Sequence, residues 1–229
     1  MDPSSWYNSL PVFTKYYMTS AFVTAVCSNF KVISPMYLFV TGEYIFKHLQ
    51  LWRLATNYIF FGGFGFGLIY MLMLINRGVG QLEKYFEKKP ADFVMCLLFN
   101  ALAILPFVMF FQLGFGSFSF AFAMLYVYCK KEPLSVVNFW GFAIKNGNFP
   151  FVLLVFFMLI GDDVQKYLLG LAVGHCYILL TEIVPVHYRW YPLRTPQWLE
   201  KMVPGPTNRE QQPTQTNRAF MGRGVRIGQ

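Results

Sequence analysis

The chain has 229 residues, of which 55% are hydrophobic, 20% are aromatic and only 13% are charged, and its net charge is +8. A soluble domain carries roughly 25% charged residues, so this composition excludes an ordinary soluble fold and makes nucleic-acid binding the weaker explanation of the positive charge. The four cysteines lie within or at the end of apolar stretches, which argues against a secreted fold held by disulfides.

Six stretches with few or no charges are candidates to cross a bilayer, which takes about 20 apolar residues. They are residues 16–34, 56–75, 93–112, 113–129, 149–161 and 167–186. The sequence therefore predicts an all-α polytopic membrane protein with six spans. The first span has no strongly basic segment before it and no clear cleavage site, so we expect it to be a retained signal anchor.

The basic residues predict the orientation in the membrane. With a cytosolic N-terminus, most of the 19 Lys and Arg residues fall on the cytosolic side, and only Lys31, Lys47, Arg53 and Lys166 fall on the other. This asymmetry is what the positive-inside rule expects of six spans with both ends in the cytosol. All five tryptophans lie outside the apolar stretches, where indole rings favour the headgroup region.

The chain divides into three parts by composition. Residues 1–186 hold the apolar stretches, and residues 187–202 form a short cytosolic segment after the last span. Residues 203–229 are rich in Pro, Gln, Thr and Asn and have little to bury. We therefore expect this last part to be a disordered cytosolic tail.

A Trp-Arg pair precedes the second apolar stretch. Trp52 suits a headgroup anchor, and the guanidinium of Arg53 suits either lipid phosphates or backbone carbonyls. With Thr56 and Asn57 behind it, the segment 43–63 resembles the signature loop of the derlins, the rhomboid-related pseudoproteases of the endoplasmic reticulum. Three further segments, in the same chain order, resemble that family: residues 90–94, 168–175 and 194–196.

The resemblance implies a rhomboid-like six-helix bundle in which the sixth span packs against the fourth. Gly170 and Gly174 lie four residues apart on one helical face, where missing side chains let another backbone approach closely. Gly63 and Gly67 offer a similar notch on the second span. We expect all four glycines to serve packing.

The resemblance also implies a function. It indicates a non-catalytic component of endoplasmic-reticulum-associated degradation that recognises misfolded proteins and helps move them to the cytosol. The implied partners are the lipid bilayer, misfolded protein substrates, a membrane ubiquitin ligase complex, the AAA segregase valosin-containing protein, and other derlin copies in a homo- or hetero-oligomer. No metal, cofactor or nucleic acid is expected.

The alternative is an active intramembrane serine protease. A rhomboid protease needs a serine in a Gly-x-Ser-Gly turn and a histidine from the sixth span. The nearest match is Phe115-Gly116-Ser117-Phe118, in which phenylalanine stands at both glycine positions of the motif, with Ser119 close by and His175 as the available base. We therefore predict that the chain is not an enzyme. A small transporter is a third possibility, but the spans lack the paired carboxylates of an ion site.

Several polar residues lie within the apolar stretches and need an interior. Those expected to face a hydrated substrate groove, or to form hydrogen bonds between helices, are Asn57, Asn100, Gln112, Ser117, Ser119 and His175.

The fifth apolar stretch is short. Its 13 residues, 149–161, cover roughly 20 Å, against a hydrocarbon core of roughly 30 Å. Either residues 134–148 extend the helix or the bilayer thins around it. Asn148 followed by Pro150 predicts a helix start at this point, which favours a locally thinned membrane that polar polypeptide crosses more easily.

The end of the chain holds a second motif. Residues 220–227 resemble the SHP box with which derlins recruit the segregase. In such a peptide, large side chains fill pockets while glycines let the backbone approach the partner. The residues predicted to bind are Phe220, Gly222, Gly224, Arg226 and Ile227.

Overall fold

The structure is a computed structural model that describes residues 3–190 and 192–205. It is mostly helical. The α-helices are α1 (Pro3–Asn8), α2 (Val12–Asn29), α3 (Gly42–Phe46), α4 (Arg53–Thr56), α5 (Phe66–Ile75), α6 (Gln81–Tyr85), α7 (Pro90–Phe110), α8 (Ser117–Lys131), α9 (Phe149–Ile160), α10 (Val164–Ile178), α11 (Val184–Tyr188) and α12 (Gln197–Met202). Shorter elements are the 3-10 turns η1 (Pro35–Tyr37) and η3 (Asn146–Asn148), the π-helical segments η2 (Asn76–Gly80) and η4 (Leu179–Ile183), and the strands β1 (Val136–Phe139) and β2 (Phe142–Lys145).

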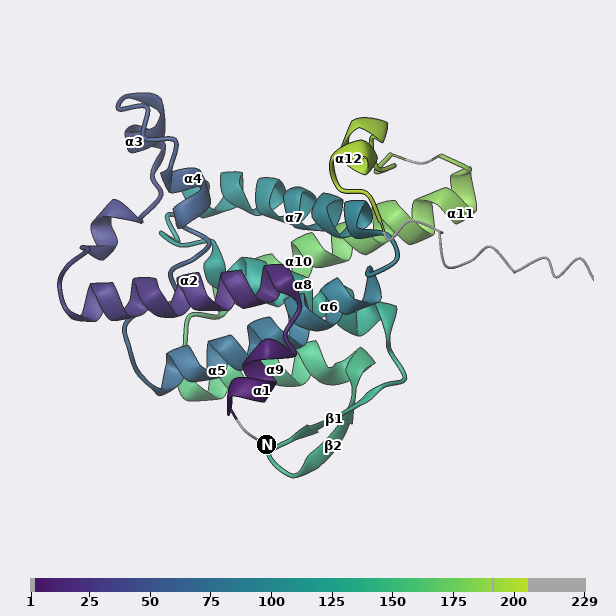
Figure 1. Cartoon of the computed structure of the whole chain (residues 1–229), viewed down its shortest axis with the longest axis horizontal. Helices are drawn as coiled ribbons and strands as arrows, with labels where there is room; N and C mark the ends of the chain where they lie inside the picture. Colours follow the sequence, from purple (N-terminus) through teal and green to yellow (C-terminus); the bar gives the residue numbers. More distant parts are fainter. Residues whose placement is uncertain (1–2, 191, 206–229) are drawn as a thin grey trace, which may run out of the picture.

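Helix α8 lies at the centre of a bundle formed by the longer helices (Figure 1). Every residue from Phe120 to Cys129 is buried, and α8 contacts α5 and η2, α7, α9 and α10. Its most extensive contact is with α10. A helix that is buried on all sides has apolar residues all around it, which explains why the fourth stretch, residues 113–129, contains no charged residue.

Each of the six predicted stretches contains a helix in the described part of the chain. Among the described residues, two helices are long and apolar enough to cross a membrane by length and composition: α7, with a mean hydropathy of 2.5, and the continuous helix Val164–Tyr188, with 1.7. The number of spans therefore remains a prediction.

The second helix does not lie where the sequence predicts it. Residues 57–65 are not helical, and the helix begins at Phe66 and continues through η2 to Tyr85, well beyond the expected end at Ile75. Glycines explain the delay, since Gly62 has a φ of +96°, which disfavours a helix, and Gly63 and Gly65 follow it.

Helix α9 begins where the sequence predicts, directly after Asn148 and with Pro150 in its first turn. Its 12 residues span about 18 Å. The segment before it does not extend the helix but forms the antiparallel hairpin β1–β2, in which Phe139 pairs with Phe142. The helix ends at Gly161, which adopts the left-handed conformation that commonly terminates helices. Helix α9 is therefore too short to match a full hydrocarbon core.

The bundle has two chemically different ends. At one end, Glu83 binds the start of α2, Lys131 pairs with Glu182, and Arg77 bonds to Asn146. At the opposite end lie the loop with α3 and α4 and the turn between α9 and α10, where Lys31, Lys47, Arg53 and Lys166 are found (Figure 1). The basic residues thus segregate between the two ends as the sequence predicts.

Candidate functional site

Arg53 holds the long loop that precedes α5. Its Nη1 donates to the carbonyl oxygens of Met36 and Phe39, both at 2.6 Å, and its Nε donates to Gln50 Oε1 at 2.6 Å. The guanidinium also stacks on Tyr44, 4.4 Å from the ring centroid, and the residue is only 3% exposed. Of the two partners considered for Arg53, the structure selects backbone carbonyls over phosphates.

Trp52 points in a different direction from its neighbour. Its side chain is 57% exposed, whereas Arg53 is buried. The two residues therefore have different roles: Arg53 binds the loop from the interior, and Trp52 is exposed to the surroundings. A headgroup contact for Trp52 stays a prediction.

Asn57 joins the same loop to the start of α8. Its side-chain amide donates to the carbonyls of Arg53 and Leu54, both at 2.8 Å, and its Oδ1 accepts from the backbone N–H of Gly116 at 3.1 Å. A Cβ at Gly116 would lie 2.7 Å from that oxygen, so a glycine is required there. Asn57 is therefore a structural cross-link in the closed interior.

Gly170 and Gly174 allow α10 to lie directly against α8. A Cβ at Gly170 would approach the carbonyl oxygen of Ser119 to 2.3 Å, and one at Gly174 would approach that of Ala123 to 2.9 Å. Both distances are below those of real contacts, so the two backbones touch only because side chains are missing. This geometry agrees with the packing role predicted for this pair.

Gly63 and Gly67 do not have the same role. A Cβ at either position would meet no heavy atom within 4 Å. The expected packing notch on the second span is thus wrong. Gly78 takes that role instead, because its Cβ would lie 2.8 Å from the backbone nitrogen of Leu125 on α8.

The candidate protease residues are not arranged as a dyad. The Ser117 hydroxyl donates to the carbonyl of Phe60 at 2.5 Å, and the Ser119 hydroxyl donates to that of Lys166 at 2.7 Å. His175 Nδ1 instead bonds the hydroxyl of Tyr126 at 2.7 Å. Tyr126 lies nine residues beyond Ser117 on the same helix, about 14 Å along its axis. A nucleophile and its base must lie within hydrogen-bond reach, which this arrangement does not provide.

The six groove candidates occupy different environments. Asn57, Asn100, Ser117 and Ser119 are fully buried, whereas Gln112 and His175 are exposed. Asn100 donates to the carbonyl of Cys96, four residues back on its own helix, at 2.8 Å. The structure does not bring the six together around a common cavity in the described part of the chain, and intramolecular hydrogen bonding accounts for most of them.

A cavity of about 510 Å³ lies between α5 and α9. Its walls are mainly aromatic and aliphatic, and they include the two open glycines, Gly63 in the loop before α5 and Gly67 in α5. The lining residues used below are Gly63, Phe66, Gly67, Tyr70, Phe156 and Phe157. Tyr70 contacts both phenylalanines, with ring centroids 6.0 and 5.7 Å apart. Aromatic contacts thus hold α5 and α9 together, without an intervening backbone contact of the kind that joins α8 and α10.

A polar cluster closes one end of this cavity. Asp162 accepts hydrogen bonds from Lys166 Nζ at 2.7 Å and from the Tyr167 hydroxyl at 2.6 Å. Partial burial acts to raise the pKa of Asp162, but the hydrogen bonds from Lys166 and Tyr167 outweigh it, so the pKa lies below its usual value. Lys166 also lies 4.1 Å from the centroid of Phe118. The cluster ties the end of α9 to the start of α10.

Two contacts that hold the bundle together, one beside the cavity and one at the opposite end, were not predicted from the sequence. The rings of Tyr167 and Phe157 stack with centroids 4.1 Å apart, which joins α10 to α9. Glu83 caps the start of α2 by accepting from the backbone N–H groups of Phe13 and Thr14, each at 2.9 Å. Neither has a local signal, because each partner lies far away in the chain or across a turn.

The predicted docking residues lie outside the described part of the chain. Phe220, Gly222, Gly224, Arg226 and Ile227 fall in the range 206–229, which the structure does not describe. The segment before them ends in helix α12, and the hydroxyl of Thr195 donates to Asp92 at the start of α7. This bond anchors the post-span segment to the bundle.

Comparisons with known proteins agree with the geometry. Residues 10–197 match the Der1-like family. The chain is 34% identical to Derlin-1 of Arabidopsis thaliana over 206 residues, which is 88% of this chain and 77% of that protein. It is 32% identical to Derlin-1 of Oryza sativa subsp. japonica over 100% of this chain and 99% of that protein, and 30% identical to Derlin-2.1 of Zea mays over 97% and 94%.

Proposed function

The chain belongs to the Der1-like family, and from this membership and the geometry above we propose that it assists the movement of misfolded proteins across the membrane of the endoplasmic reticulum. It does so as a non-catalytic component of endoplasmic-reticulum-associated degradation. The proposed arrangement has six spans in residues 1–186 and both termini in the cytosol. The segregation of basic residues between the two ends of the bundle supports this orientation.

The observation that carries the proposal is the short helix α9 beside the aromatic cavity. At about 18 Å, α9 falls well short of a hydrocarbon core of about 30 Å, and residues 136–145 form a hairpin instead of lengthening it. A bilayer that meets so short a helix thins around it. The cavity between α5 and α9 opens beside this region, so a polypeptide that enters it crosses less hydrocarbon.

We propose that the chain is not catalytic because the hydroxyl groups of its two candidate serines are hydrogen-bonded elsewhere. Ser117 and Ser119 each donate to a backbone carbonyl. His175 bonds instead to Tyr126, which lies farther toward the C-terminal end of α8 than either serine. A serine whose proton is shared with a carbonyl oxygen has no base to activate it. The energy for transport is proposed to come from the AAA segregase, recruited through residues 220–227, with a membrane ubiquitin ligase and further derlin copies as partners.

The test compares two tryptophan substitutions at exposed small residues. Gly67→Trp adds a large side chain at the wall of the cavity between α5 and α9, at a position where nothing lies within 4 Å of a Cβ. Ala172→Trp adds the same side chain to an exposed position on α10, outside the cavity. In cells that lack other derlins, the turnover of a misfolded membrane protein is followed after protein synthesis is stopped.

We expect Gly67→Trp to lengthen the half-life of the substrate severalfold and Ala172→Trp to leave it unchanged, at equal amounts of derlin. Equal half-lives for both variants would refute a role for the cavity. Deletion of residues 220–229 tests the docking step separately: the segregase should no longer co-purify, while the folded bundle remains.

A further inference from the structure

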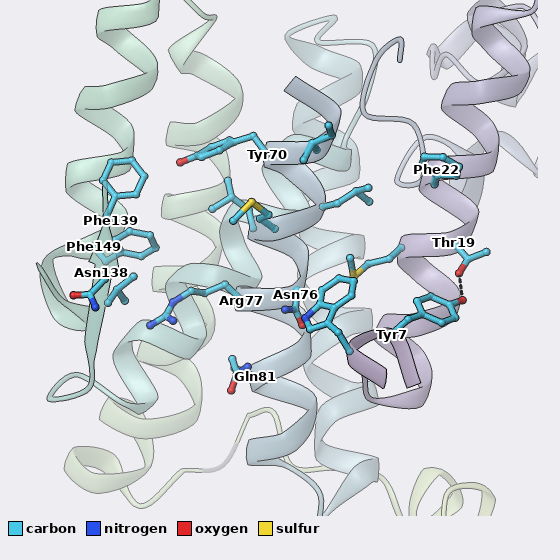
Figure 2. Close-up of a pocket in the computed structure, with 17 residues that line it drawn as sticks. Tyr7, Thr19, Phe22, Tyr70, Asn76, Arg77, Gln81, Asn138, Phe139 and Phe149 are labelled. Atoms are coloured by element: carbon cyan, nitrogen blue, oxygen red, sulfur yellow. Dashed lines mark hydrogen bonds between the residues drawn. The ribbon is translucent and has the colours of Figure 1, made fainter. Parts of the chain in front are cut away.

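A second cavity, of about 820 Å³, lies on the other side of α5. Figure 2 shows α5 and η2 at its back, α1 and α2 along one side, and the hairpin with the start of α9 along the other. Tyr70 lines both this cavity and the one between α5 and α9, so only a thin wall separates the two. The volume is within the range of about 300–1,000 Å³ that is usual for ligand sites.

The lining changes from apolar to polar along one helix. Ile69, Leu72 and Met73 line the first part, and Asn76, Arg77 and Gln81 line the second. From Ile69 to Gln81 the helix rises about 18 Å. Met18 and Phe22 of α2 extend the apolar part, and Asn138 of the hairpin extends the polar part (Figure 2). A ligand that fits must itself be apolar at one end and polar at the other.

Arg77 makes the polar end positive. Its Nη2 donates to Asn146 Oδ1 at 2.9 Å, but its Nε is fully buried and has no hydrogen-bond partner in the described part of the chain. The lining includes no aspartate or glutamate, and the described residues show no ion pair to Arg77. A partly buried cation without a counter-ion is costly, and an anionic group in the cavity beside the guanidinium would lower that cost.

We propose that this cavity holds one membrane phospholipid, with its phosphate on Arg77 and one acyl chain along α5 between α2 and the hairpin. The guanidinium group matches the geometry of a phosphate, and the phosphate supplies the counter-ion that Arg77 lacks. Arg77 lies at the end of the bundle that carries most of the basic residues, which is the depth at which phosphates of that leaflet are found. The apolar part then runs toward the middle of the bilayer, as an acyl chain does.

Bound lipid has a structural consequence. The hairpin packs on α9 through Phe139, whose ring lies 5.8 Å from Phe149 and 5.4 Å from Phe156. An acyl chain in the cavity would support the inner face of the hairpin and the back of Tyr70. The lipid therefore stiffens the wall behind the opening between α5 and α9.

The test measures phospholipid retained by the purified full-length chain. The protein is incubated with phosphatidylglycerol in detergent, and bound lipid is counted by native mass spectrometry. Met73→Trp blocks the apolar part, and its control is Met158→Trp on α9, since the two methionines are 66% and 68% exposed. Arg77→Gln removes the cation, and its control is Lys84→Gln, an exposed cation at the same end.

We expect one lipid per chain in the wild type and both controls, none in Met73→Trp, and about tenfold weaker binding in Arg77→Gln, the change for one lost hydrogen bond to a charged group. Inorganic phosphate at millimolar concentration should not displace the lipid. Equal retention in Met73→Trp and Met158→Trp would overturn the proposal, as would displacement by phosphate or a retained peptide in place of lipid. If Arg77→Gln fails to fold, the methionine pair alone decides.

Discussion

The contact between α8 and α10 can be tested with one pair of glycine substitutions. Gly170→Ala places a Cβ 2.3 Å from the carbonyl oxygen of Ser119, an atom of the backbone that cannot rotate away. Gly67→Ala adds the same methyl group where nothing lies within 4 Å. Gly170 lies in the interior of α10 and Gly67 lies in the first turn of α5, so alanine gains up to about 1 kcal/mol of helix propensity at Gly170 and less at Gly67.

The difference between the two variants isolates the steric effect. Because the larger propensity gain at Gly170 offsets part of the cost of overpacking, about 1–3 kcal/mol, Gly170→Ala should be less stable than Gly67→Ala by up to about 3 kcal/mol. For a chain of this size, 1 kcal/mol corresponds to about 2–4 °C in Tm. We therefore expect Gly170→Ala to melt below Gly67→Ala by up to about 12 °C, with Gly67→Ala at or above the wild type.

Buried thiols supply the assay. Cys96 and Cys129 are fully buried, while Cys176 is exposed and Cys27 is partly exposed. In a background with Cys27→Ser and Cys176→Ser, a thiol-reactive fluorophore labels the chain only when the bundle opens on heating. If Gly170→Ala and Gly67→Ala shift the midpoint by the same amount in the same direction, the close approach of α8 and α10 is refuted.

Three further predictions concern polar contacts. Arg53→Gln should make limited proteolysis of the loop of residues 36–50 about tenfold faster, because several hydrogen bonds to a charged group are lost, and Arg53→Lys should be intermediate. Equal cleavage rates in the three proteins would refute the role of Arg53 in holding the loop. Glu83→Gln should lower Tm by about 2–4 °C, since a cap contributes about 1 kcal/mol, whereas the exposed Glu87→Gln should not. The pKa of Asp162 is lowered in the folded chain, so its stabilising effect is present above the unfolded pKa and is lost as the pH falls through the folded pKa. Asp162→Asn should therefore lower Tm at pH 7, and melting curves at several pH values should no longer show the acid-dependent loss of stability.

Local sequence signals predicted much of the bundle. Asn148 and Pro150 mark the start of α9, and the spacing of Gly170 and Gly174 places both on the face that meets α8. In each case the determining residues lie within one helical turn. Arg53 was singled out for the same reason, although its partners at Met36 and Phe39 could be identified only in the structure.

Features that depend on tertiary contacts could not be read in this way. The β-hairpin turns at Trp140 and Gly141, which both have positive φ, as a two-residue type I′ turn requires. Trp-Gly is not the Asn-Gly or Asp-Gly pair that usually signals this turn, and Phe139 on the aromatic face of α9 stabilises the hairpin instead. The four glycines likewise look alike in sequence, but only a neighbouring helix distinguishes a packed glycine from an open one.

The two kinds of helix contact explain how one bundle can be both rigid and open. Helices α8 and α10 meet backbone to backbone, at distances that exclude even a methyl group at Gly170. Helices α5 and α9 contact each other through aromatic side chains such as Tyr70 and Phe157, which can change rotamer without moving a backbone. An opening between α5 and α9 therefore costs side-chain contacts alone, while the α8–α10 contact stays intact. Both cavities beside α5 border on such a side chain, since Tyr70 lines each of them.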